Sequence, residues 1–486
     1  MPKTKPSDEA LYLEAAENGD VQKMKNLLSK EHFYHTCRSE SEDKFQWNVM
    51  HRAALNAASK SGREKVVEYL IVEQQINIEG QGNPGNNTTP LHLAANNGHL
   101  NVVKFLTGQG ANIEAKDQAD NNQTPLHCAA IYGKLEVVKF LVQKGAKIEA
   151  KDAENWTPVL YAAVYGHVQV IKFLFQKGAQ KNAKNDKNDT LLHLAARNGN
   201  LSVVNFLLNE GCTLDAKNIF GETPLHSAIR CGHLKITKQL VQKKAFIDSK
   251  DNVGQTPLHL TSFFGNLEIV KFLISKGAQI SAKTTTNHLT PLHCAAKGGH
   301  VKIVDYFRLK GISLDMKTKD GHTPLHLAVQ EGHLNVVEFL KQKEVQMDIR
   351  NNVNQTPLHL AVDKGHKKIV EFLLQQSSEV QINAKDVDNN TPLHYARKNG
   401  FVEIAELLLQ KNASKTARNS ENETPFDLTG KNDQGEQIEA SGSKRKANDI
   451  DDNIQKTKVS RIEVTDENDF SNDDIGKKVF WNQYIS

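Results

Sequence analysis

The sequence predicts an all-α solenoid of stacked helix–turn–helix units, followed by a disordered C-terminal tail. Three observations lead to this expectation. A stretch that reads Thr-Pro-Leu-His occurs eight times in the 486 residues, and its first copy begins at Thr89. From Thr89 to Thr424 the starting threonines of intact and weaker copies are 33 to 35 residues apart, which is the period of a repeat protein. From residue 431 onward this hydrophobic period is lost.

The first helix of each unit is predicted by residues suited to helix ends, as the copy at Thr89 shows. Thr89 is a good N-cap because its hydroxyl can accept from an otherwise unpaired backbone N–H of the first turn. Pro90 suits the first helical position because its φ is already fixed. The small pair Ala94-Ala95 leaves one helix face open to close approach by a neighbour. Gly98 then ends the helix with the left-handed conformation that glycine favours.

A second helix is expected to begin at His99 and to end at Gly110. Its apolar residues recur with helical spacing, which indicates one buried face. They are Val102, Val103, Phe105 and Leu106. Residues 111–117 have too little helical pattern to continue it, so we expect an extended excursion to a hairpin-like loop.

This unit closely resembles the ankyrin repeat, and the resemblance extends over residues 7 to 429. It implies about 12 repeats plus a truncated one at the C-terminal end. It also implies that the motif histidine, His92 in the first copy, hydrogen-bonds loop backbone and joins adjacent repeats. Ankyrin repeats bind many unrelated protein partners, so the resemblance indicates a scaffold without naming what it binds.

The chain divides into four predicted parts. Residues 1–30 form an N-terminal capping repeat. Residues 31–82 form an irregular repeat with insertions, of which 31–47 read as an irregular polar segment. Residues 83–429 hold the regular repeats and a truncated C-terminal cap. Residues 430–486 form a charged tail that is too polar to bury a core, and we expect it to be disordered.

Composition argues against several classes of function. The net charge of +4 is too small to indicate direct binding of nucleic acid. No stretch approaches 18 consecutive apolar residues, so we expect no membrane insertion, and the N-terminus shows no classical signal peptide. The five cysteines are scattered and form no Cys-x-x-Cys pair. No catalytic motif is present, so we expect no enzyme activity, no cofactor and no metal site.

The candidate binding residues lie where the repeat leaves a free choice. In ankyrin repeats, the two residues before the glycine that ends the first helix, and the loop residues before the threonine, face a concave groove. In the middle of this chain several of them are large and apolar, or arginine, which favours an interaction patch. The predicted patch comprises Ile131, Tyr132, Trp156, Val164, Tyr165, Arg197, Phe220, Arg230, Phe263 and Phe264.

Two alternatives to an interaction patch stay open. Phe263 and Phe264 could fill a gap, because Thr261 and Ser262 replace the alanine pair in that repeat. The clustering could also arise by chance in a chain with 19 phenylalanines and nine tyrosines.

The tail contains two basic clusters that resemble a bipartite nuclear localisation signal, which implies a nuclear import receptor as a partner. They comprise Lys444, Arg445 and Lys446, and then Lys456, Lys458 and Arg461. Acidic residues in the spacer leave open a merely solvated, charge-mixed tail. The aromatic residues 479–485 are either a motif for a second partner or a segment that docks back on the solenoid.

Together these observations favour a scaffold or adaptor that recognises a partner protein through its concave face, and that sequesters or regulates it. We expect it in the cytoplasm and, through the tail, in the nucleus. Two alternatives fit the same sequence. One is a host-directed effector of an intracellular microbe, and the other is a membrane-skeleton linker that binds the tail of a membrane protein.

Overall fold

The computed structural model describes residues 7–29, 43–80, 87–118, 121–376 and 380–428. Within these ranges all regular structure is helical, apart from an isolated β-bridge between Lys184 and Thr190. The helices form twelve successive pairs, as the sequence predicts, and each pair is one repeat.

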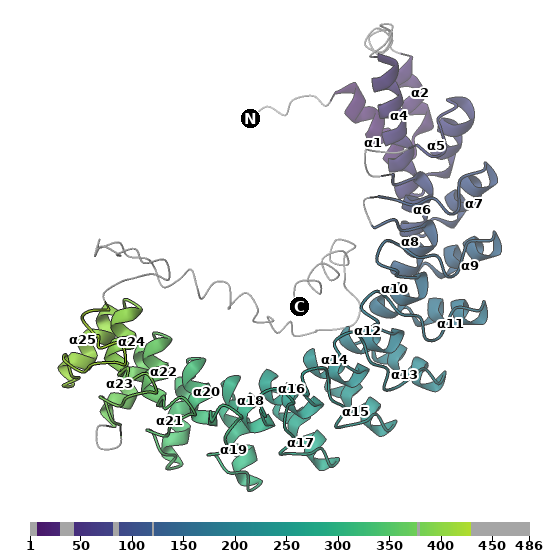
Figure 1. The fold of residues 1–486 in the computed structure, drawn as a ribbon. Helices are drawn as coiled ribbons and strands as arrows, with labels where there is room; N and C mark the ends of the chain where they lie inside the picture. The colour runs from purple at the N-terminus through teal and green to yellow at the C-terminus, as the bar shows by residue number, and fades with distance from the viewer. Residues whose placement is uncertain (1–6, 30–42, 81–86, 119–120, 377–379, 429–486) are drawn as a thin grey trace. The chain divides into compact units, whose positions relative to one another are not determined.

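The first helices of the pairs form one row and the second helices form another (Figure 1). The first helices are α1 (Asp8–Asn18), α4 (Asp43–Lys60), α6 (Pro90–Asn97), α8 (Pro125–Ile131), α10 (Pro158–Tyr165), α12 (Leu191–Arg197), α14 (Pro224–Arg230), α16 (Pro257–Phe264), α18 (Pro291–Lys297), α20 (Pro324–Gln330), α22 (Pro357–Asp363) and α24 (Pro392–Lys398). The second helices are α2 (Val21–Leu28), α5 (Glu64–Glu68) with the π-helical turn η1 (Tyr69–Glu73), α7 (Leu100–Gly108), α9 (Leu135–Gln143), α11 (Val168–Gln176), α13 (Leu201–Asn209), α15 (Leu234–Gln242), α17 (Leu267–Ser275), α19 (Val301–Leu309), α21 (Leu334–Gln342), α23 (Lys367–Gln375) and α25 (Val402–Gln410).

The core lies between the two rows and runs from repeat to repeat. Ala94 and Ala95 are fully buried, and so are Val102, Val103 and Leu106 of the same repeat. Each helix of the regular repeats contacts its own partner and the equivalent helix of the next repeat. Because stability in such a stack comes from repeats and the interfaces between neighbours, no single central core is required.

The motif histidine links consecutive repeats, as the resemblance implies. The backbone N–H of Thr89 donates to Nδ1 of His92 over 3.2 Å, which leaves the ring proton on Nε2. That Nε2–H donates to the carbonyl of Gln123 in the following loop, over 3.0 Å. Burial lowers the pKa of His92 to about 4, so the ring is neutral.

Repeat five departs from this pattern because Leu160 stands where the motifs of the other regular repeats carry histidine. Leu160 is fully buried but cannot make either hydrogen bond. Among the described residues, the hydroxyl of Thr157 consequently has no hydrogen-bond partner. The seam between repeats five and six therefore lacks the histidine link.

The two ends of the stack are less regular. Helix α4 has 18 residues and begins at Asp43, so the expectation that all of residues 31–47 are irregular is wrong at their C-terminal end. A long first helix is favoured there because the glycine that follows, Gly62, comes late. At the other end, the segment after Thr424 forms a turn, and the guanidinium of Arg397 lies 4.8 Å from the ring centroid of Phe426.

Candidate partner-binding surface

Five successive first helices, α8, α10, α12, α14 and α16, bring the predicted patch together. Each of these helices contacts the next one along the chain. We call the following side chains, which lie at or directly after the ends of these helices, the aromatic–arginine strip: Tyr132, Tyr165, Arg197, Arg230, Phe263 and Phe264. In repeat order the strip reads aromatic, arginine, aromatic.

At the α10 end of the patch, Trp156 is held rigidly beside Tyr161. The two rings stack with their centroids 5.0 Å apart. The Tyr161 hydroxyl donates to Oδ2 of Asp152 over 2.6 Å, and the backbone N–H of Trp156 donates to Oδ1 of the same carboxylate over 2.8 Å. Trp156 is thus half-buried in a fixed position, and Tyr161 is the residue that sequence reasoning missed.

Tyr132, Val164 and Tyr165 are each half-buried. The Tyr165 ring stacks against the ring of His167 with a centroid separation of 6.5 Å, and burial raises the pKa of Tyr165. All three side chains keep part of their surface accessible, as a binding patch requires.

The prediction that Ile131 lies on the binding surface is wrong. Its exposed fraction is only 8%, so it belongs to the core and not to the binding surface. Its carbonyl accepts from Nε2 of His167 over 2.8 Å, which fixes the end of α8 to the next repeat. The side chain of Ile131 therefore packs inward at a position that carries a polar residue in most other repeats.

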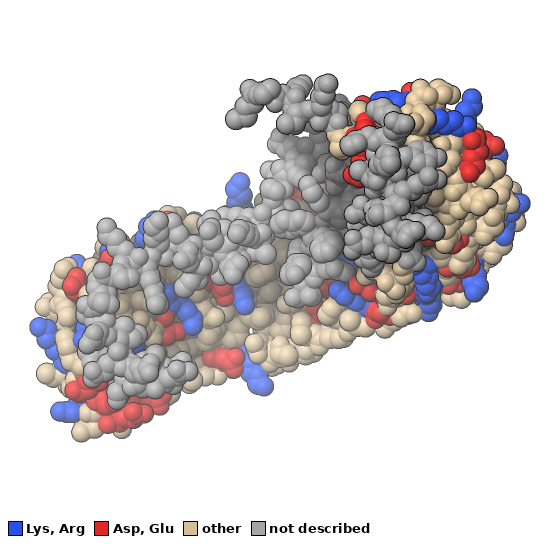
Figure 2. Space-filling view, turned by 90° about the horizontal axis from the view of Figure 1, so that it is seen from above, with Lys and Arg blue, Asp and Glu red and all other residues tan. Residues whose placement is uncertain are grey.

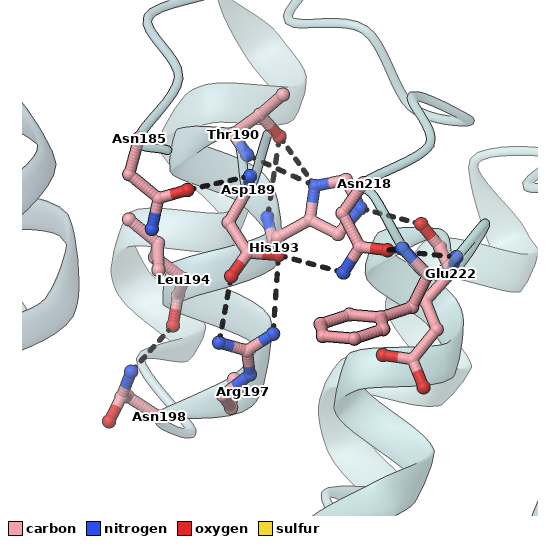
Figure 3. A network of polar contacts seen from close by, with 10 residues as sticks. Asn185, Asp189, Thr190, His193, Leu194, Arg197, Asn198, Asn218 and Glu222 are labelled. Carbon is pink, nitrogen blue, oxygen red and sulfur yellow. Dashed lines mark hydrogen bonds and ion pairs between the residues drawn. The ribbon is translucent and has the colours of Figure 1, made fainter. Parts of the chain in front are cut away.

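The middle of the strip is a polar network around a buried carboxylate (Figure 3). Asp189 has a side chain that is only 1% exposed. The guanidinium of Arg197 donates two hydrogen bonds to this carboxylate, from Nη1 to Oδ2 over 2.9 Å and from Nη2 to Oδ1 over 3.2 Å. The Nδ2 of Asn218 adds a third, over 2.9 Å, from the next repeat. A buried carboxylate is stable only with such partners.

The next repeat uses a second arginine in the same way. Arg230 pairs with Glu222, whose side chain is also nearly buried. Its guanidinium carbon lies 5.8 Å from the ring centroid of Phe264, close enough for a cation–π contact. The paired carboxylates at Asp189 and Glu222 largely neutralise the two arginines, a feature that the prediction did not include.

Phe263 and Phe264 are the most exposed members of the strip, at 40% and 44%. Their rings pack edge to face with centroids 5.4 Å apart. Thr261 and Ser262 are themselves buried, and the Ser262 hydroxyl donates to the carbonyl of Leu258 over 2.6 Å. The alternative that the phenylalanines fill a gap beside these residues is therefore wrong.

The loops beside the strip add apolar surface. Phe220 is 44% exposed, as predicted for a groove residue. Sequence reasoning missed two neighbours in equivalent loops, Ile219 and Val253, which are both 47% exposed. Charged residues elsewhere are interspersed: Figure 2 shows lysine and arginine mixed with aspartate and glutamate on the face that it presents.

A family model described as ankyrin repeats (3 copies) matches seven overlapping segments that together span most of the chain. They are residues 12–117, 55–152, 91–185, 148–218, 192–284, 281–351 and 342–419. The chain is an ankyrin-repeat protein. No curated protein matches it.

Ankyrin repeats in general form protein-binding scaffolds. The described residues contain no group of three or more histidine, cysteine, aspartate or glutamate side chains placed to hold a metal ion. They also contain no helix with the length and apolarity that crossing a membrane would require.

One small pocket lies between repeats nine and ten of this ankyrin-repeat protein. Its volume is about 210 Å³, and its lining includes Leu289, Lys297, His322 and Gln330. These repeats follow repeat eight, which carries Phe263 and Phe264. The pocket was not predicted from the sequence.

The basic clusters of the predicted localisation signal, residues 444–446 and 456–461, lie outside the described residues. They stay a prediction.

Proposed function

We propose that this ankyrin-repeat protein binds a partner protein through the aromatic–arginine strip and the loops beside it, on the concave face expected for the family. The observation that supports this most directly is the exposed pair Phe263 and Phe264. The equivalent pairs in other repeats include Asn96-Asn97 and Gln330-Glu331, which are polar. Two adjacent exposed phenylalanines at a position that is polar in most other repeats favour a contact surface.

The energetics of burial fit this role. Burying one phenylalanine side chain fully contributes about 1.5–3 kcal/mol, so the half-exposed pair can supply about 2 kcal/mol to binding. Arg197 and Arg230 are held in place by their carboxylates and lose little conformational freedom when a partner arrives. Fixed aromatic and arginine side chains are the usual hot spots of protein interfaces.

A pull-down from cell lysate tests the proposal with a matched control. One bait carries F263S and F264S together, and the control bait carries F246S. Phe246 is 66% exposed but follows the second helix α15, away from the strip. Circular dichroism first verifies that both variants remain folded.

We expect the double variant to retain a partner at least about tenfold less well, which corresponds to about 1.4 kcal/mol, while F246S retains it fully. Equal capture by all three baits would overturn the proposal. The identity of the captured protein then decides the role: a membrane-protein tail favours the linker, a host protein favours the microbial effector, and a protein of the same cell favours the adaptor or sequestering inhibitor.

A further inference from the structure

The pocket between repeats nine and ten corresponds to a place that holds a buried carboxylate three repeats earlier. Lys297 in α18 stands seven residues after its motif threonine, where Arg197 stands in α12. The residue directly before the threonine is Asp189 in repeat six but Leu289 in repeat nine. Repeat nine therefore keeps the cation and lacks the acid that pairs with it.

The first helices of these two repeats end in the same way. Nε2 of His233 donates to the carbonyl of Arg197 over 3.0 Å, and Nε2 of His333 donates to the carbonyl of Lys297 over 2.9 Å. Both helices have 7 residues and end at the basic residue itself. The two basic side chains therefore leave their helices from equivalent positions.

The pocket has room for the missing group. Leu289 and Lys297 both line it, and its volume of about 210 Å³ is several times the roughly 30 Å³ share of one water molecule. The amino group of Lys297 pairs with Glu331 at 3.7 Å, but the two side chains are 41% and 36% exposed. Such exposed pairs are weak, so this one can give way to a better-placed carboxylate.

The lining supplies further hydrogen-bond donors. Thr318 is 8% exposed, and its hydroxyl accepts from the backbone N–H of His322 over 3.0 Å, which leaves the hydroxyl hydrogen to donate. Nδ2 of Asn351 donates to Nε2 of His322 over 3.0 Å, so the ring hydrogen is on Nδ1. The side-chain amide of Gln330 also lines the pocket.

The position of Thr318 again matches repeat six. It lies five residues before its motif threonine, as Asn218 does in repeat seven. Asn218 donates to the carboxylate of Asp189 in the preceding repeat over 2.9 Å (Figure 3). In both places a cation of one repeat and a donor of the next repeat therefore stand beside the same space.

We infer that this pocket receives an aspartate or glutamate side chain of the partner protein, with Lys297 as its counter-ion and Thr318 as a hydrogen-bond donor. Phe263 also lies seven residues after its threonine, and its helix α16 contacts α18. One segment of the partner can therefore cover the exposed phenylalanines and place an acid in the pocket. That the acid belongs to the partner of the strip rests on the proposed function, whereas the affinity of the pocket for a carboxylate does not.

A carboxylate suits the pocket better than a phosphate group does. The lining also includes Asp320, an exposed residue whose charge opposes the entry of any anion. This repulsion is larger for a doubly charged phosphate than for a singly charged carboxylate.

The first test titrates glutamate, blocked as its acetyl and N-methylamide derivative, into the full chain with isotope-labelled leucine methyl groups. Leu289 and Leu327 line the pocket, so we expect their signals to shift. Blocked glutamine should bind at least about tenfold more weakly, because charge-assisted hydrogen bonds are about twice as strong as neutral ones. K297Q should lose the binding, whereas K398Q, at the equivalent end of α24, should keep it. Equal affinity for the two blocked amino acids, tighter binding of inorganic phosphate, or unchanged binding to K297Q would overturn the inference.

A second variant fills the pocket from within. L289E places an acid directly before the motif threonine, as in repeats six and seven, and L289Q is its uncharged control of equal length. After circular dichroism verifies the fold, the titration is read at Leu327. We expect L289E to bind blocked glutamate at least about tenfold more weakly, and L289Q to change the affinity by less than about threefold. Equal binding to L289E and the unchanged chain would contradict the inference.

The pull-down then separates this inference from the proposed function. L289E should capture the partner of the strip about tenfold less well than L289Q does. A partner that L289E and the unchanged chain capture equally, but that F263S with F264S loses, would overturn the assignment of the acid to this partner and leave the proposed function standing. Loss of the proposed function alone would leave the result of the titration with blocked glutamate unchanged.

Discussion

The buried motif histidines should make the stability of the stack depend steeply on pH. Burial lowers the pKa of six of them to about 4, compared with an ordinary value of about 6.5. They are His92, His226, His259, His293, His326 and His359. Between these two pKa values the unfolded chain binds more protons than the folded one, so acid favours unfolding.

The sign and size follow from linkage. The stabilisation is fully present above pH 6.5 and is lost as the pH falls from about 6.5 towards about 4. For one histidine, the drop in the free energy of unfolding between pH 7.5 and pH 5.5 is about 1.3 kcal/mol. Six histidines together would cost about 8 kcal/mol, spread over the repeats that contain them.

Urea unfolding followed by circular dichroism at pH 7.5, 6.5 and 5.5 measures this effect. We expect the free energy of unfolding, and with it the midpoint, to fall about three times as far from pH 6.5 to 5.5 as from pH 7.5 to 6.5. The variant H259N, which removes one buried imidazole, should be less stable than the unchanged chain at pH 7.5. Its free energy of unfolding should, however, decrease by about 1 kcal/mol less between pH 7.5 and pH 5.5. A midpoint that stays constant down to pH 5.5 would refute the reasoning, since the histidines would then bind protons equally in both states.

Three further predictions concern the strip, the turns and the tail. R197M should lower the free energy of unfolding by about 2–3 kcal/mol in urea titrations because it leaves a buried carboxylate without its charge partner, and replacing that aspartate by asparagine in the same chain should recover part of the loss. G265A should lower the melting temperature more than G277A: both glycines have positive φ, 85° and 91°, but a Cβ at Gly265 would collide with the ring of His300, whereas the space at Gly277 is open. Alanines in place of the basic residues 444–446 should move a fluorescent fusion from the nucleus to the cytoplasm, and an unchanged distribution would argue against the localisation signal.

The repeat architecture could be predicted because its signals are local. Thr89, Pro90 and Gly98 satisfy requirements of helix ends that need no knowledge of the rest of the fold, and the 33-residue period multiplies that evidence. The Arg197–Asp189 and Arg230–Glu222 pairs were predictable in principle. In both repeats the acid precedes the arginine by eight residues.

The exposure of individual strip residues could not be predicted as well. Ile131 and Phe263 occupy equivalent positions after their threonines, yet one is buried and the other is 40% exposed. The difference depends on contacts with the side chains of the neighbouring repeats, which differ between the two places. Such contacts join residues about 30 positions apart, and the local pattern does not specify them.

Because Leu160 replaces the motif histidine, the interface between repeats five and six should resist mechanical tension less well than interfaces that have the histidine link. The motif histidines hydrogen-bond the loop of the next repeat, and the interface between α10 and α12 lacks this bond. The Nδ2 of Asn200 still donates to the carbonyl of Ala163 across that interface. In the described residues the Nε2 of His226 also has no hydrogen-bond partner, so the interface between repeats seven and eight lacks the same link. Pulled from its ends, the solenoid should separate first at one of these two interfaces. The aromatic–arginine strip crosses both interfaces, so tension would split the binding surface before the separated blocks unfold, and a bound partner would be released by stretching.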